Sequence, residues 1–194
     1  MTEAEESFYT RERWQNWLTR VDEEDIDFDD EDSARLLWNM REDTAIAVAK
    51  IVAAYEDDRL EEADAREKLE KVREIVLEDV DFEDEEKLML VDDVQTSLLC
   101  VFYAAEEYVA SDEVPEGSVE EYVRAAAESE AEEDMDAALG YLVQAGTLVI
   151  DGASFDVGIL DEFEYGLVAV WVNGLDSLQS AMSDPEVVEE EDED

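Results

Sequence analysis

Apolar residues recur at intervals of three and four through most of the chain, the spacing that places side chains on one face of an α-helix. After Thr10, a residue that caps helices, Trp14, Trp17, Leu18 and Val21 follow this spacing. The same pattern, together with two capping-box motifs, predicts about six to seven helices. Three helices are expected to begin after a cap: one after Thr10, one after the Asp58 and Glu61 box, and one after the Ser118 and Glu121 box. The others are expected at about 33–55, at about 83–110, from Ala131 to about 150, and at about 157–182.

Few residues break these stretches, and they fall between them. Pro115 and Gly117 interrupt the chain ahead of Ser118. The Asp151-Gly152 pair should end a helix, because glycine readily takes the left-handed conformation at a helix C-terminus. Residues 167–172 are apolar on all sides, so we expect them near the centre of the bundle. Residues 147–150 and 167–172 also suit β-strands, and a small β-hairpin there is the alternative.

The pattern as a whole predicts an all-α fold, a multi-helix bundle that forms a single domain over residues 1–182. Residues 183–194 are strongly acidic and have no apolar face to join a core, so we predict a disordered acidic tail.

Two acidic segments, residues 25–32 and 79–86, are similar, and each precedes a long amphipathic stretch. Leu36 and Val48 then fall in register with Leu90 and Phe102. Two pseudo-repeated helical hairpins are one interpretation. The other is that the same local physics arose twice, because an acidic first turn suits the positive end of a helix dipole.

Composition matters most at the surface. Sixty Asp and Glu residues oppose thirteen Lys and Arg residues, for a formal net charge of −47, while the hydrophobic fraction of 46% is sufficient for a core. Dissolved salt makes such a surface tolerable, because the Debye length falls from about 8 Å at physiological ionic strength to about 3 Å at 1 M. We therefore expect a cytoplasmic protein of a salt-accumulating halophile, surrounded by monovalent counter-ions.

The residue types that most catalytic and metal sites require are missing. The chain has no histidine, one cysteine and no glycine-rich phosphate loop. Asp25, Asp27 and Asp29 match the first three positions of a calcium-binding loop, but Asp30 and Leu36 stand where glycine and a bidentate glutamate are needed. We predict no catalytic residue, no metal and no cofactor, and we favour a protein that is not an enzyme.

The sequence also argues against nucleic acid and membrane as partners. Residues 125–194 contain no Lys or Arg, so that part of the chain has no basic group for phosphates. The N-terminal residues are acidic and lack an apolar signal region, and no apolar run approaches the roughly 20 residues of a membrane span. Apolar neighbours predict that Cys100 and the four tryptophans, Trp14, Trp17, Trp38 and Trp171, lie in the core.

Two segments carry a resemblance to a known family. They are Tyr9-Thr10-Arg11-Glu12-Arg13-Trp14-Gln15-Asn16-Trp17 and Ala53-Ala54-Tyr55-Glu56-Asp57-Asp58-Arg59-Leu60. Together they resemble a family of uncharacterised haloarchaeal proteins, a domain of unknown function, and the resemblance extends over most of the chain between Tyr9 and Met182. It implies an archaeal cytoplasmic setting and brings no known activity, cofactor or catalytic residue.

The function expected is that of a non-enzymatic protein–protein interaction or regulatory module that binds an unknown protein or self-associates. Terminal helices have the fewest neighbours to cover them, so the predicted interaction surface comprises Trp14, Trp17, Leu18, Leu175, Leu178 and Met182. One alternative is a small-molecule-binding or enzymatic helical bundle. The other is an acidic nucleic-acid mimic that binds a basic protein.

Overall fold

The computed structural model of the chain describes residues 8–27, 29–111 and 113–183, and these residues form helices with no β-strand. The prediction of an all-α fold is confirmed. The elements are α1 (Arg11–Glu23), α2 (Glu31–Glu56), α3 (Glu62–Val76), α4 (Glu85–Ala110), α5 (Val119–Ala131), α6 (Met135–Ile150), the 3-10 helix η1 (Val157–Glu162) and α7 (Leu167–Ser183).

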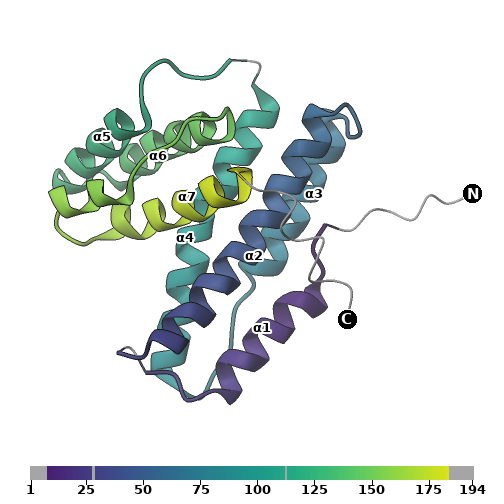
Figure 1. Ribbon diagram of the computed structural model, residues 1–194, viewed down its shortest axis with the longest axis vertical. Coiled ribbons are helices and arrows are strands. Elements are labelled where there is room, and N and C mark those ends of the chain that lie inside the picture. The colour runs from purple at the N-terminus through teal and green to yellow at the C-terminus, as the bar shows by residue number, and fades with distance from the viewer. Residues whose placement is uncertain (1–7, 28, 112, 184–194) are drawn as a thin grey trace, which may run out of the picture.

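The two longest helices, α2 and α4, lie side by side and run in the same direction (Figure 1). Helix α3 returns antiparallel to both, and α1 lies at the opposite side of α2 from the C-terminal helices. Helices α6 and α7 pack on α4, α5 packs on α6, and α7 also crosses α2. The chain therefore forms a four-helix layer from α1 to α4 with a three-helix layer on one face.

Local capping explains where several helices begin. The Thr10 hydroxyl accepts a hydrogen bond from the Arg13 backbone N–H at 3.1 Å, as predicted for the start of α1. The Ser118 and Glu121 capping box is also confirmed, since each side chain accepts from the other residue's backbone N–H. The box predicted at Asp58 and Glu61 is wrong: Asp58 has a φ of 58° in the turn after α2, and Glu61 caps α3 without a side-chain hydrogen bond.

The predicted helix from Ala131 begins four residues later, because Glu133 takes a left-handed φ of 64° and Asp134 caps the new helix. The predicted helix over 157–182 is likewise divided into η1 and α7. A side chain from another helix explains the second break, since Glu130 accepts hydrogen bonds from the backbone N–H groups of Leu167 (2.6 Å) and Val168 (3.4 Å) at the start of α7.

Residues 147–150 and 167–172 both lie in helices, so the β-hairpin alternative is wrong. The predicted end of α6 is confirmed: Asp151 is its C-cap, and Gly152 has a φ of 108°. Residues 168–172 are buried, as expected for a segment near the centre of the bundle. Ser183 closes α7 and is not part of a tail, while residues 184–194 lie outside the described residues, so their predicted disorder stays a prediction.

One large cluster of buried apolar residues connects all the helices. Cys100 is buried in it, as predicted, and burial raises the pKa of its thiol. The expectation for the tryptophans is confirmed for Trp14 and Trp171, which are buried. Trp17 is half-buried, and the expectation is wrong for Trp38, whose side chain is 45% exposed.

Helix α4 is the most apolar long helix and lies at the centre of these contacts. By length and composition it could cross a membrane, because an 18-residue stretch has a mean hydropathy of 1.4. Half of that stretch is buried against the rest of the fold, and core helices of soluble proteins pass the same test. The sequence predicts no apolar run of about 20 residues and so does not single out α4. The reason is that scattered polar residues interrupt the apolar face of this helix.

The order of short helix, acidic connector and long helix occurs twice. Helices α2 and α4 each have 26 residues, and each follows an aspartate N-cap, Asp30 and Asp84. The shorter helices before them, α1 and α3, have 13 and 15 residues. The pattern is that expected of two pseudo-repeated units, and their origin by duplication stays a prediction.

Candidate functional site

The predicted interaction surface does not form a continuous exposed face. Trp14, Leu18, Leu175 and Leu178 are buried. The other two members, Trp17 and Met182, are half-buried. The argument that terminal helices lack neighbours is wrong for this fold, because α7 crosses α2 and α4 and α1 is fastened to α2.

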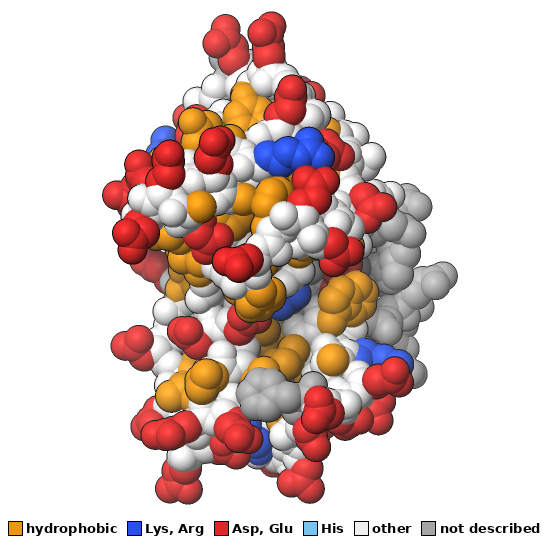
Figure 2. Space-filling view, turned by 90° about the vertical axis from the view of Figure 1, so that its left-hand side faces the viewer, with side chains coloured by type: hydrophobic (Ala, Val, Ile, Leu, Met, Phe, Trp, Pro, Cys, Tyr) orange, Lys and Arg blue, Asp and Glu red, His pale blue; other side chains and the backbone are white. Residues whose placement is uncertain are grey.

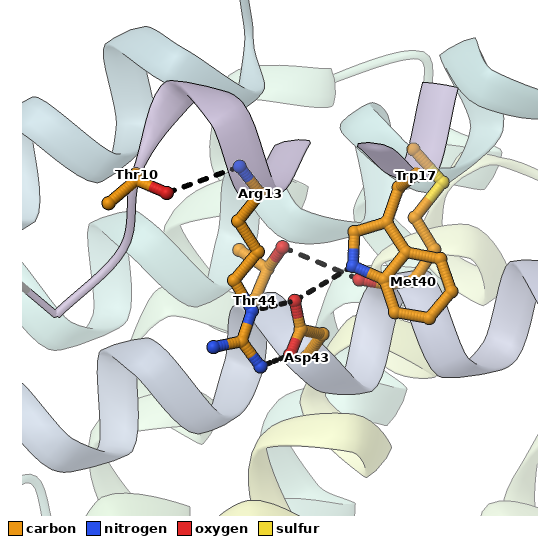
Figure 3. A network of polar contacts seen from close by, with 6 residues as sticks. All are labelled: Thr10, Arg13, Trp17, Met40, Asp43 and Thr44. Atoms are coloured by element: carbon orange, nitrogen blue, oxygen red, sulfur yellow. Dashed lines mark hydrogen bonds and ion pairs between the residues drawn. The ribbon is translucent and has the colours of Figure 1, made fainter. Parts of the chain in front are cut away.

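A polar network around Asp43 of α2 connects α1 to α2 (Figure 3). The Asp43 carboxylate accepts from Arg13 Nε and from Trp17 Nε1, both at 2.8 Å, and pairs with a second Arg13 nitrogen. The Asp43 side chain is only 9% exposed, so the carboxylate is largely shielded from solvent, whereas the Arg13 side chain is 38% exposed. This network fixes the orientation of α1 and is structural.

A second polar group lies where α2, α4 and α7 meet. At its centre is Arg41, whose side chain is 13% exposed. Arg41 Nε donates to the Ser97 hydroxyl at 2.9 Å, and another guanidinium nitrogen lies 3.8 Å from the Asp93 carboxylate. Asp176 and Tyr165 also interact electrostatically with this guanidinium. We call Arg41, Glu42, Asp93, Ser97, Tyr165 and Asp176 the Arg41 cluster.

Burial and like charge disturb the titration of the cluster's acids. Burial raises the pKa of Glu42 to about 7, and Asp176 adds to the rise while Arg41 opposes it. Burial also raises the pKa values of Asp93 and Asp176, again against the effect of Arg41. The Oε2 atom of Glu42 is buried and accepts no hydrogen bond from the described residues. Arg41 thus lies among three carboxyl groups, those of Glu42, Asp93 and Asp176, whose simultaneous ionisation is unfavourable.

The cluster does not resemble a catalytic arrangement. The Ser97 hydroxyl donates to the Val94 carbonyl at 2.6 Å while it accepts from Arg41, so its proton and a lone pair are both engaged. A nucleophilic serine needs a base at its proton, and a backbone carbonyl cannot take one. In the described part of the chain, no group of three or more metal-ligating side chains is placed to hold an ion.

Two exposed aromatic residues adjoin the Arg41 cluster. Tyr165 belongs to it and is 76% exposed. Trp38 precedes Arg41 by one helical turn on α2, so their side chains share a face. Figure 2 shows hydrophobic side chains and a basic side chain in a hollow between two lobes, whose outer surfaces carry many acidic side chains. On the face shown in Figure 2, apolar side chains therefore gather in the recess between the lobes.

Tyr165 also lines a cavity of about 570 Å³ between α5 and residues 163–166, which we call the α5–α7 pocket. A second cavity, of about 580 Å³, lies between the end of α3 and the first half of α4, and the exposed Met89 borders it. Exposed and half-buried residues line both cavities.

Sequence reasoning missed the Arg41 cluster. The available signal was an arginine within the apolar stripe of α2, four residues after Leu37 and three before Thr44. Its partners could not be identified, because sixty acidic residues leave a carboxylate near almost any position.

The fold defines an all-α, carboxylate-covered protein with a polar cluster around one largely buried arginine side chain, that of Arg41, between its main helices. The chain belongs to the family described as an uncharacterized protein conserved in archaea (DUF2150), whose model matches residues 7–191. The predicted family of unknown function is thereby confirmed. Comparison with curated proteins gave no match, and comparison with solved structures gave none either.

Proposed function

We propose that this archaeal protein is a non-enzymatic interaction module that binds another protein in a salt-rich cytoplasm. The observation that carries the proposal is the exposure of Trp38 and Tyr165 beside Arg41, whose side chain is largely buried at 13% exposure. Trp, Tyr and Arg are the residues most enriched among those that dominate binding energy at protein interfaces. A partner that covers both rings would exclude water from such anchors.

The use of the basic residues supports a halophilic setting. Several of them tie one element to another, which leaves most of the surface to carboxylates. The pairs are Arg11 with Glu78, Arg13 with Asp43, Arg41 with Asp93, Arg73 with Glu106, Lys87 with the Asp22 carbonyl, and Arg124 with Glu162. A surface of this charge repels itself less when salt shortens the Debye length to about 3 Å.

In such salt, attraction between distant charges contributes little to binding. A specific complex must then depend on close apolar and aromatic contacts, which salt does not weaken. Trp38 and Tyr165 provide these contacts. The enzymatic alternative has less support, because Ser97 donates its proton to a backbone carbonyl and the two cavities lie between surface elements.

The test is affinity capture from an archaeon that carries the protein, at its native salt, with mass spectrometry of the captured proteins. Wild type should retain a partner that Trp38→Ala and Tyr165→Ala each lose. Tyr103→Ala is the matched control, since Tyr103 is another exposed aromatic residue, on α4, and lies outside the Arg41 cluster.

Circular dichroism must show that all variants keep the helix content of wild type. A partner retained equally by every variant would contradict the proposed surface. A protein that is monomeric, captures nothing and gains thermal stability from a metabolite would favour the small-molecule alternative instead.

A further inference from the structure

We infer that the α5–α7 pocket binds an arginine or lysine side chain of a partner protein. The inference rests on the proposed function and adds the chemistry of the partner. The pocket has a volume of about 570 Å³, large enough for one long side chain. The residues that matter for recognition are Arg124, Ala127, Glu128, Phe163, Glu164 and Tyr165.

Two sets of hydrogen bonds connect the two sides of the pocket. On one side, the Arg124 guanidinium donates to both carboxylate oxygens of Glu162, at 3.1 and 3.3 Å, and joins α5 to η1. On the other side, Glu130 of α5 caps the first backbone N–H groups of α7. The pocket is therefore formed before any ligand arrives, which reduces the ordering cost of binding.

The charge of the walls favours a cation. Arg124 is the last basic residue of the chain, and Glu162 already neutralises it. Glu128 and Glu164 line the pocket and form no ion pair with the described residues. An anion would meet these two free carboxylates, whereas a guanidinium or ammonium group would pair with them.

The apolar walls favour a cation on an aliphatic stem over a bare ion. Ala127, Phe163 and Tyr165 provide surface for methylene groups, and the two rings can stack on a guanidinium. In molar salt, free potassium competes for the carboxylates but gains nothing from these apolar contacts. A side chain of a bound partner protein would gain both kinds of contact.

The test uses two acetylated, amidated tripeptides, glycyl-arginyl-glycine and its glutaminyl counterpart, titrated into ¹⁵N-labelled full-length protein in molar KCl. We expect saturable shifts of the amides at 124–131 and 163–168 with the arginyl peptide, at a Kd on the order of 1 mM for a single side chain. The glutaminyl peptide should leave them unchanged.

Glu128→Gln with Glu164→Gln should weaken binding roughly fivefold, the loss expected for two partly exposed charge contacts. Glu107→Gln, an exposed glutamate on α4, should have no effect. Equal shifts with the glutaminyl peptide, or no effect of the double variant, would overturn the cation site. Tighter binding of spermidine at the same amides would assign the pocket to a small polyamine and overturn the partner assignment.

The two proposals fail differently. If a captured partner depends on Trp38 but the arginyl peptide does not bind, only the pocket inference is wrong. If the peptide binds but no protein is captured, the proposed function is wrong, and the assignment of the cation to a partner is wrong with it.

Discussion

The Trp17 indole N–H donates to the Asp43 carboxylate at 2.8 Å, across the interface between α1 and α2. Arg13, one turn earlier on α1, donates to the same carboxylate. One acceptor on α2 thus orients two side chains of α1 whose aliphatic and aromatic parts pack beside it. The position of the first helix therefore depends on this acceptor as well as on the burial of Trp14, Leu18 and Val21.

Asp43→Asn should therefore destabilise the protein by about 2 kcal/mol, because it removes the shielded negative charge that accepts from both Arg13 and Trp17. Chemical denaturation in molar KCl measures the change. Trp17→Phe, which removes only the N–H donor and part of the ring, should cost about 1 kcal/mol, and the double variant less than the sum. Asp81→Asn, at an exposed position in the connector before α4, should stay within about 0.5 kcal/mol of wild type.

Two glycines should respond in opposite ways to alanine. A Cβ at Gly174 would lie 2.0 Å from the Ser97 carbonyl oxygen, so α7 would have to move away from α4. Gly174→Ala should cost about 3 kcal/mol. A Cβ at Gly140 in α6 meets no atom within 4 Å, so Gly140→Ala should stabilise by about 1 kcal/mol through helix propensity. Thermal unfolding followed by circular dichroism measures the stability of both variants. If Gly174→Ala were as stable as Gly140→Ala, the α4–α7 contact would tolerate a methyl group.

The sequence predicted the helices well because helical periodicity and caps are local. The positions of α1, α2 and α4 and the Ser118 box depend on residues within one or two turns. The break before α7 was missed because Glu130, 37 positions away from Leu167, caps that helix. Periodicity cannot report a partner at that distance in the sequence.

The site was harder to predict, for a related reason. The periodic stripe correctly identified Trp14, Leu175 and Leu178 as apolar-face residues, but it could not say which faces another helix would cover. Trp38 occupies a comparable position and is exposed. Exposure depends on how α7 crosses α2, and no local pattern encodes that crossing.

The capping of α7 by Glu130 leads to a further prediction. A Cβ at Gly166 would lie 2.5 Å from the Glu130 carboxylate, so Gly166→Ala should displace it from the Leu167 N–H. Glu130→Ala removes the same cap, and each variant should cost about 1 kcal/mol. Because both act on one contact, the double variant should cost clearly less than their sum in a denaturation experiment. Full additivity would mean that the glycine and the glutamate act independently.

The net charge of −47 predicts that folding depends on salt. Helix content should rise with KCl up to the molar range, because screening relieves repulsion between surface carboxylates. Circular dichroism during a KCl titration measures it. Sucrose at matched osmolality is the control, since it strengthens burial without screening charge. Full helix content in dilute buffer would contradict the halophilic setting.

The pH dependence of the free energy of unfolding should reveal the raised pKa of Glu42. Its ordinary pKa of 4.5 rises to about 7 in the fold, first because of burial and then because of Asp176. Between these values the folded state holds a proton that the unfolded state has released. The stability that Glu42 contributes is therefore complete below about pH 4.5 and is lost as the pH rises through 7.

Glu42→Gln replaces the carboxyl group by a permanently neutral one, so it should stabilise the protein at pH 8 and not at pH 4.5. The full shift would correspond to about 3 kcal/mol, and partial solvent exposure reduces the expected gain to about 1 kcal/mol. Denaturation at a series of pH values in 2 M KCl measures it, and Glu107→Gln is the exposed control. Because burial is the larger cause, the gain should persist at this salt concentration; a gain that disappears there would assign the shift to Asp176 instead.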